Sequence, residues 1–161
     1  MTLKIVTVPD PILTKKAEPV KKIDRTILKL ANDMIETCKK ANGVGLAAPQ
    51  IGKSIRLCII NLEHLGLASF ALINPKITKK SSKKIELEEG CLSIPGVYGI
   101  VKRPEKIKLR ATNLQGEDNT LETDGLVARV IQHEIDHLDG ILITSKIIKR
   151  TDPTEKKELR E

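Results

Sequence analysis

Apolar residues in the first third of the chain repeat every three or four positions, which is the period of a helix with one buried face. Asp24 precedes this segment and can cap its first backbone N–H groups. Asn42 and Gly43 follow it, and glycine readily adopts the left-handed conformation that ends a helix. The pattern therefore predicts an α-helix from residue 24 to about residue 41. Its buried stripe consists of Ile27, Ala31, Met34, Ile35 and Cys38.

A second helix is predicted over residues 125–139, where apolar side chains cover most of the helical circumference. Thr123 or Asp124 can cap its start, and Gly140 follows its end. A helix that is apolar on so many sides must be buried on most of them, so we expect it to lie at the centre of the fold. The apolar positions are Leu126, Val127, Val130, Ile131, Ile135 and Leu138.

Several shorter segments alternate apolar and polar residues, or form brief apolar runs, as strands do. Pro75 should stop one of these strands, because proline lacks the N–H that a sheet ladder needs. Asp152 and Pro153 indicate the start of a short last helix. The expected strands are residues 3–8, 55–60, 70–74, 85–87, 107–111, 120–123 and 141–143, with a charged turn at 77–84.

These elements predict an α+β fold in which small, mostly antiparallel or mixed sheets wrap around one central buried helix. The chain has 161 residues, a length that suits one domain with a sizeable core. No internal repeat and no linker-like composition divides it. We therefore expect residues 1–161 to form a single domain.

The net charge of +7 raises the possibility of an acidic partner such as nucleic acid. The basic residues are dispersed in pairs along the chain, however, and the two aromatic residues, Phe70 and Tyr98, do not interleave them to stack on bases. We interpret the lysines as solvated surface and expect no specific nucleic-acid partner. Weak attraction to a polyanion is the alternative interpretation.

The three cysteines are an odd number, which argues against a disulfide framework and for a reducing compartment. Lys4 and Pro9 stand where a signal peptide would need an apolar run. No apolar stretch approaches the length of a membrane span. We therefore expect a cytoplasmic protein without a membrane partner.

Residues 132–140 carry the clearest chemical signal in the sequence. His133 and His137 are four residues apart, so on a helix they share one face and can bind the same metal ion. Glu134 lies one position further round, where it can reach water at the metal without being a ligand, as in the H-E-x-x-H motif of zinc hydrolases. With only three histidines in the chain, we interpret this segment as a metal site rather than as an ordinary amphipathic helix.

A catalytic metal needs a third protein ligand and an open position. Cys38 lies on the apolar stripe of the first helix and Cys58 lies in a predicted strand, so both suit the core. Cys91 lies outside any helical stripe, at the end of a predicted strand, and is the candidate ligand as a thiolate. The third histidine, His64, is expected to be exposed in a loop.

Three segments resemble, in order, the signature motifs of the peptide deformylases. They are residues 43–50 (GVGLAAPQ), residues 89–93 (EGCLS) and residues 132–138 (QHEIDHL). The resemblance extends over nearly the whole chain, including residues 9–13 and 73–75. Without it, the small uncharged residues of the first segment indicate either a tight connection or a place where backbone approaches a ligand closely.

The resemblance implies a metal held by Cys91, His133 and His137. It implies Fe²⁺ as the cellular metal, with Zn²⁺, Ni²⁺ or Co²⁺ as substitutes. Thiolate and imidazole donors suit several of these ions, so the sequence alone does not choose between them.

The implied reaction removes the formyl group from the N-terminal formyl-methionine of newly synthesised proteins and releases formate. A metal-bound hydroxide would attack the formyl carbon, and Glu134 would act first as general base and then as general acid. The Gln50 amide and the Leu92 backbone N–H would donate to the formyl oxygen as it gains negative charge.

The resemblance also implies a substrate site. Backbone near Gly45 is expected to pair with the extended substrate by strand addition. Arg129 would lie at the rim of the methionine pocket, and it must reach either solvent or a carboxylate because the rest of its helix is apolar. The candidate pocket residues, which would suit a core equally well, are Val44, Leu87, Leu126 and Val130.

The expected partners are formyl-methionyl nascent peptides. The tail after Arg150 is short, whereas some relatives carry a longer basic helix that docks on the ribosome, so we expect any ribosome contact to be weak. Three alternatives stay open at the level of the sequence. They are a metallopeptidase with the same H-E-x-x-H motif, a structural metal module with a fourth protein ligand, and a nucleic-acid-binding module that would rest on charge alone.

Overall fold

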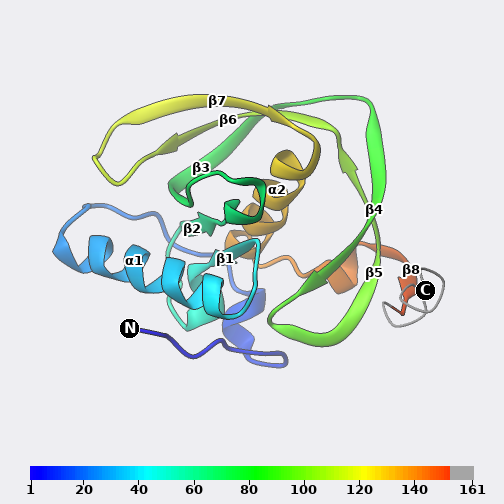
Figure 1. Cartoon of the computed structure of the whole chain (residues 1–161), viewed down its shortest axis with the longest axis horizontal. Helices are drawn as coiled ribbons and strands as arrows, with labels where there is room; N and C mark the ends of the chain where they lie inside the picture. The colour runs from blue at the N-terminus through cyan, green and yellow to red at the C-terminus, as the bar shows by residue number, and fades with distance from the viewer. Residues whose placement is uncertain (153–161) are drawn as a thin grey trace.

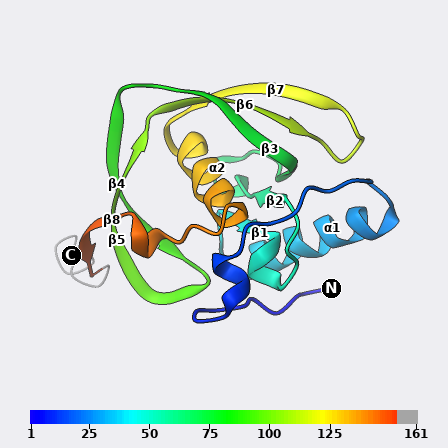
Figure 2. The same cartoon turned by 180° about the vertical axis from the view of Figure 1, so that it is seen from behind.

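The computed structural model describes residues 1–152 and has the predicted α+β architecture. Two α-helices accompany two antiparallel sheets, and both sheets curve around helix α2 (Figures 1 and 2). The helices are α1 (Arg25–Lys40) and α2 (Gly125–Leu138). The larger sheet has the order β1 (Gly45–Ala47), β2 (Leu57–Ile60), β3 (Phe70–Lys80), β6 (Lys106–Thr112) and β7 (Asp118–Asp124). The smaller sheet has the order β4 (Lys84–Cys91), β5 (Ile94–Pro104) and β8 (Ile147–Thr151).

Helix α2 is buried along most of its length, as its apolar circumference predicted. Its inner side chains pack with those of β2, β3 and β6 in one hydrophobic cluster. Leu126, near its start, is 43% exposed, so the first turn reaches the surface. The buried residues of this helix's apolar face are Ala128, Val130, Ile131, Ile135 and Leu138.

Helix α1 lies within one residue of its predicted bounds at each end, and it packs against β1 and β2 of the larger sheet. The Asp24 side chain caps its start by accepting a hydrogen bond from the Ile27 N–H at 3.1 Å. Asn42, not Gly43, adopts the left-handed conformation after its end, with φ of 54°. Asparagine tolerates this region better than most residues, so the helix ends one residue earlier than glycine alone would indicate.

No strand forms at residues 3–8, so the prediction of an N-terminal strand is wrong. This segment forms no sheet, because its N–H groups bond to the Thr37 side chain of α1 and to two turns, and not to the edge of a strand. The Val6 N–H donates to the Gln50 carbonyl oxygen at 2.7 Å, and the Val8 N–H donates to the Ser93 carbonyl oxygen at 2.9 Å. Through these two hydrogen bonds the segment connects the turn that follows β1 with the turn that follows β4.

Strand β3 runs through Pro75 to Lys80, so the prediction that Pro75 stops it is wrong. The ladder with β6 shifts register between Ile73 and Lys76, and Asn74 has a positive φ of 51°. This bulge carries the proline past the position where a backbone N–H is needed. The charged turn predicted at residues 77–84 is accordingly confined to the three residues between β3 and β4.

Three strands, β1, β5 and β8, were not predicted, and a second predicted strand is absent. Strand β5 forms a hairpin with β4, and β8 pairs with the other side of β5. Residues 141–143 do not form a strand, since η4 (Ile143–Ser145) is a short 3-10 helix. The predicted last helix, capped by Asp152 and starting at Pro153, lies outside the described residues apart from Asp152, which follows the end of β8.

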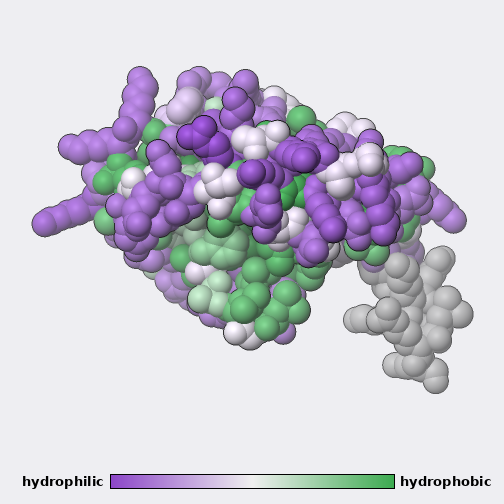
Figure 3. Space-filling view, turned by 90° about the horizontal axis from the view of Figure 1, so that it is seen from above, coloured by the Kyte–Doolittle hydropathy of each residue, from purple (hydrophilic) through white to green (hydrophobic). Residues whose placement is uncertain are grey.

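The hairpin of β6 and β7 matches its prediction, and its outer side is hydrophilic. Ile107, Leu109 and Ala111 point inward and are buried, whereas Lys108 and Arg110 between them are exposed. Figure 3 looks onto the molecule from this side and shows mostly hydrophilic side chains in its upper half, with an apolar area below them. Among the helices of the described residues, none is long and apolar enough to span a membrane.

Candidate metal centre

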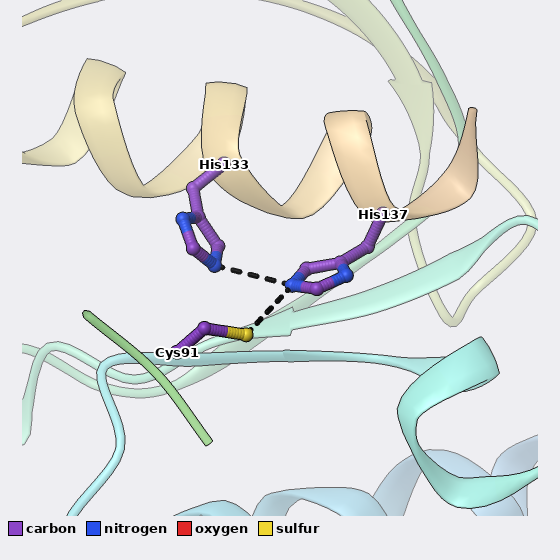
Figure 4. Close-up of side chains that lie close together, drawn as sticks. All are labelled: Cys91, His133 and His137. Carbon is purple, nitrogen blue, oxygen red and sulfur yellow. Dashed lines mark hydrogen bonds between the residues drawn. The ribbon is translucent and has the colours of Figure 1, made fainter. Parts of the chain in front are cut away.

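Helix α2 and the end of β4 bring two histidines and a cysteine together (Figure 4). His137 Nε2 lies 3.2 Å from His133 Nε2 and 3.2 Å from Cys91 Sγ. The ligand atoms of the three residues all lie within 4.8 Å of one another. In the part of the chain that the structure describes, this is the one group of three or more potential ligands that could hold a metal ion.

The donor set fits a soft or borderline transition metal, since it combines a thiol sulfur with two imidazole nitrogens. The two Nε2 atoms converge at hydrogen-bond distance, and a cation held between them would use a lone pair from each. Three protein donors leave a coordination position open, as a catalytic site requires. The residues therefore fit the Cys, His and His site that the sequence predicted.

Glu89, two residues before Cys91, orients one of the two imidazoles. His133 Nδ1 lies 2.9 Å from Glu89 Oε1, so a proton on Nδ1 leaves Nε2 free to bind a metal. Arg103 donates to the same carboxylate through Nε at 2.6 Å and Nη2 at 2.9 Å. Burial alone would raise the pKa of Glu89, but the hydrogen bonds from His133 and Arg103 outweigh burial and hold its pKa well below the usual range.

Arg129 completes this buried charge cluster, and it does not reach solvent. Its guanidinium donates to Glu89, to the Val101 carbonyl oxygen at 3.0 Å and to the Ile85 carbonyl oxygen at 2.6 Å. The sequence indicated that Arg129 must reach either solvent or a carboxylate. The carboxylate that it binds is that of Glu89. Because Ile85 and Val101 belong to β4 and β5, Arg129 also fixes the smaller sheet against α2.

Glu134 lies on the same helix beside the metal ligands and is 3% exposed. Its Oε2 atom has no hydrogen-bond partner within residues 1–152. Burial raises the pKa of Glu134 to about 7. Burial likewise lowers the pKa of the neighbouring His137 well below its usual value, which favours the neutral imidazole that a metal needs.

Gly45 forms the opposite wall against Glu134. A Cβ atom at this position would lie 2.5 Å from Glu134 Oε1, closer than real side chains approach. Backbone can come this near to the carboxylate only without a side chain. The close approach of backbone that the small-residue segment suggested is therefore an approach to Glu134.

Gln50 faces the metal ligands with its amide orientation fixed. The Ala47 N–H donates to Gln50 Oε1 at 2.9 Å, so Nε2 points toward Ser93 Oγ at 3.1 Å and Cys91 Sγ at 3.6 Å. Leu92 occupies the turn between β4 and β5, and no acceptor lies against its N–H among the described residues. Two donors, one side chain and one backbone, thus flank Cys91.

A cavity of about 180 Å³ opens beside Cys91 and His133 of this cluster. It contains four of the five predicted substrate residues, namely Val44, Gly45, Leu126 and Val130. Leu87 lies outside the lining and is 46% exposed on β4. The remaining lining comes from the site itself: Gln50, Glu88, Glu89, Gly90, Cys91, Leu92, Arg129, His133 and Glu134.

Glu89, Arg103 and Ser93 were not assigned roles from the sequence. Glu89 and Ser93 flank Cys91 in its motif, which was the available signal. Arg103 gave no local signal, because it directly follows Lys102 near the end of β5 and looks like one of two ordinary exposed basic residues. Its burial depends on contacts with Glu89 and with Asp136, 33 residues away.

Comparison with known proteins identifies the family. The family model for polypeptide deformylases matches residues 2–153. A peptide deformylase from Dictyoglomus thermophilum is 48% identical over 157 residues, which cover 98% of this chain and 100% of the relative. The crystal structure of peptide deformylase from Thermotoga maritima has a TM-score of 0.87 and 41% identity, and the match covers 91% of this chain and 98% of that one.

A second solved structure shows the same fold with a peptide bound. It is the Met-Ala-Ser-bound class I type b peptide deformylase from Acinetobacter baumannii, with a TM-score of 0.86, 36% identity and coverage of 91% of this chain and 99% of that one. Similarity extends along almost the entire sequence and through the fold that positions Cys91, His133 and His137. This chain therefore belongs to the polypeptide deformylase family of metal-binding hydrolases.

Proposed function

We propose that residues 1–161 act as a single catalytic domain that hydrolyses the formyl group from the N-terminal formyl-methionine of newly synthesised polypeptides. The products are formate and a free N-terminal amine. The observation that carries this proposal is the position of Glu134, which is buried beside the Cys91, His133 and His137 cluster with one carboxylate oxygen unpaired among the described residues. Such a carboxylate is suited to exchange protons with a reacting group.

The peptide backbone of the substrate would add to the open edge of the larger sheet. β1 is its edge strand, and the Asn61 N–H donates to the Val44 carbonyl oxygen at 2.8 Å. Because backbone groups alternate in direction along an antiparallel strand, those of Gly45 face away from β2, toward the cavity. An extended peptide can pair with them, and binding of Met-Ala-Ser by the relative from Acinetobacter baumannii supports such a substrate.

The methionine side chain would enter the cavity between β4 and α2. Leu126 and Val130 supply apolar surface from the helix, and Val44 supplies it from the opposite wall. Leu126 and Val44 are 43% and 41% exposed in this structure, so a bound apolar side chain would remove further surface from water. Leu87, on the edge strand β4, would contact the substrate at the rim.

Cys91, His133 and His137 would hold the metal, for which we propose Fe²⁺ in the cell and Zn²⁺, Ni²⁺ or Co²⁺ as substitutes. When bound, the ion supplies Lewis acidity, which lowers the pKa of water from 15.7 toward about 7. Glu134 takes the proton of the attacking water and later gives it to the leaving nitrogen. General acid–base catalysis of this kind contributes roughly 10²–10⁴-fold to the rate.

The formyl oxygen gains negative charge during the attack. Gln50 Nε2 and the Leu92 N–H are the donors that flank Cys91, and the Ala47 N–H holds the Gln50 amide in the donating orientation. Because this orientation exists before the substrate binds, no reorganisation is required during the reaction. Loss of one such donor typically lowers kcat by about 10²–10³-fold.

The proposed substrates are nascent chains, which places the reaction in the cytoplasm, where they are made. A ribosome contact would bring the enzyme close to them. We propose that any such contact is weak and that neither a membrane nor a specific nucleic acid is needed for the reaction.

The test is formate release from formyl-Met-Ala-Ser by the metal-loaded wild type and by the Glu134→Gln variant. Glutamine keeps the shape of the side chain but cannot accept the proton, so we expect kcat to fall by at least about 10²-fold with bound metal unchanged. Glu122→Gln, on the exposed face of β7, is the matched control and should behave as wild type. A Glu134→Gln variant with normal kcat would remove Glu134 from the mechanism.

A further inference from the structure

One buried side chain, Asn61, holds the cleft wall at Gly43, Val44 and Gly45 from behind. Its Nδ2 donates to the Gly43 carbonyl oxygen at 2.9 Å, and its own backbone N–H donates to the Val44 carbonyl oxygen at 2.8 Å. The residue is 8% exposed. Two consecutive carbonyl groups of the wall are therefore bound by the same residue.

The loop that follows β2 fixes Asn61 in turn. Its Oδ1 accepts a hydrogen bond from Ser69 Oγ at 3.0 Å and one from the Glu63 N–H at 3.3 Å. These bonds set the amide orientation, because an oxygen that accepts from both groups leaves the nitrogen directed at Gly43. Residues 61–69 thus support the wall on the side away from the cavity.

The wall needs such support because regular pairing there is short. β1 begins at Gly45 and is three residues long, so Gly43 and Val44 precede the strand. On the other side, Gly45 already lies as close to Glu134 as backbone can. Gly43 is also bound by Cys38, whose Sγ donates to its carbonyl oxygen at 3.3 Å and whose carbonyl oxygen accepts from its N–H at 2.9 Å. Val44 and Gly45 lie between Asn61 and Glu134, and any displacement of them would move the Gly45 backbone groups relative to the carboxylate.

We propose that Asn61 is a positioning residue for the peptide backbone of the substrate. It fixes the Gly43–Val44–Gly45 wall so that the N–H and carbonyl of Gly45 are presented to an extended peptide at a set distance from Glu134. This inference rests on the proposed function, in which the substrate adds to the edge of β1. It assigns Asn61 to substrate binding and not to metal binding.

Asn61→Asp tests the contact with Gly43 selectively. Aspartate keeps two acceptors for Ser69 and Glu63 but loses the donor to Gly43, whose carbonyl would then face a carboxylate oxygen. The matched control is Asn74→Asp. The Asn74 side-chain amide also binds backbone: it donates to the Val20 carbonyl oxygen at 2.8 Å and accepts from the Val20 N–H at 2.8 Å. Asn74 lies outside the cavity lining.

The measurements are KM and kcat for formyl-Met-Ala-Ser, the Kd of the unreactive peptide Met-Ala-Ser, bound metal and Tm. For Asn61→Asp we expect KM and Kd to rise about five- to tenfold, the effect of roughly one hydrogen bond, while kcat changes by less than about twofold and bound metal is unchanged. Asn74→Asp should lower Tm without raising KM or Kd. Unchanged KM and Kd in Asn61→Asp, or an equal rise in Asn74→Asp, would overturn the proposal.

Ser69→Ala provides a second variant if Asn61→Asp does not fold. It removes one of the two bonds that orient the Asn61 amide, and we expect a smaller rise in KM and Kd, of about two- to threefold. Wild-type Kd and KM in Ser69→Ala would then overturn the proposal. Absence of formate release by the wild type would instead count against the proposed function, and the Met-Ala-Ser Kd would still test the role of Asn61.

Discussion

At the scale of single residues, the site depends on close packing of backbone against a carboxylate. Gly45 and Glu134 come from elements 89 residues apart, and a methyl group on Gly45 would overlap the Glu134 side chain. Glu134 is the flexible partner, so the clash would displace its carboxylate and leave the backbone of β1 in place. The absence of a side chain at Gly45 therefore allows the short distance between the proposed substrate-binding edge and the proposed base.

Gly45→Ala tests this arrangement. We expect kcat to fall by about 10-fold or more, because the displaced carboxylate no longer exchanges protons at the productive distance. Bound metal should be unchanged, since neither Gly45 nor Glu134 is a proposed ligand. Kinetics on formyl-Met-Ala-Ser with metal analysis would check this, with Gly116→Ala in the β6–β7 turn as a control for loss of a glycine. Wild-type kcat in Gly45→Ala would show that the carboxylate has room to move without consequence.

The sequence predicted the metal ligands because their signals are local or chemically distinctive. Helical periodicity alone puts His133 and His137 on one face, and Cys91 was singled out as the cysteine outside the apolar patterns. Glu89 and Asn61 could not be assigned in this way. Each acts through partners more than ten residues away, so its role exists only once the chain is folded.

At the scale of secondary-structure elements, a buried ion network connects α2 with the smaller sheet. Glu89 of β4 binds Arg103 of β5 and Arg129 of α2, and Arg103 also binds Asp136 at 2.8 Å. The side chains of Glu89, Arg103 and Arg129 are at most 7% exposed. A buried charge left without its partner is strongly destabilising, so these elements are bound to one another as a unit.

Arg129→Met should therefore destabilise the fold. Methionine fills much of the volume but leaves Glu89 with one fewer cation and frees the Ile85 and Val101 carbonyl groups. We expect the free energy of unfolding to fall by about 3–5 kcal/mol, as it does when one partner of a buried pair is removed. Urea denaturation would measure it.

Arg110→Met, on the exposed face of β6, is the control for this substitution and should change stability by less than about 0.5 kcal/mol. Equal stability of the two variants would show that the buried network contributes nothing beyond packing. The comparison separates burial of the charge from loss of an arginine as such.

Prediction of the elements succeeded where periodicity was long and failed where pairing depended on distant strands. Both α-helices and the β6–β7 hairpin were predicted because each is defined by its own repeat and caps. The segment at residues 3–8 has the composition of a strand, but its N–H groups bond to a helix side chain and to turns. β3 passes Pro75 through a bulge, which a local rule against proline cannot anticipate.

At the scale of the whole molecule, the cavity beside Cys91 and His133 forms where each of the two sheets ends in an edge strand. β1 ends the order of the larger sheet and β4 ends the order of the smaller one, and residues of both strands line the cavity with α2. The apolar side of α2 packs against the larger sheet through side chains other than the proposed metal ligands. The fold thus supplies the ligands from elements that the core already holds in place.

Removal of the metal should consequently abolish activity without unfolding the protein. After chelation we expect an unchanged far-UV circular dichroism spectrum at 25 °C and a lower Tm, because a ligand present at 100 times its Kd stabilises by about 2.7 kcal/mol. Loss of the helical signal on chelation would instead indicate a structural metal module. Thermal scans with and without added Zn²⁺ make the comparison.

The most direct test of the account is formate release from formyl-Met-Ala-Ser by anaerobically purified protein, with bound metal quantified in each sample as metal is removed and restored. We predict that the rate rises in proportion to bound metal up to one ion per chain, and that Fe²⁺ gives full activity. Absence of release at one bound ion per chain would contradict the assignment of this site to deformylation.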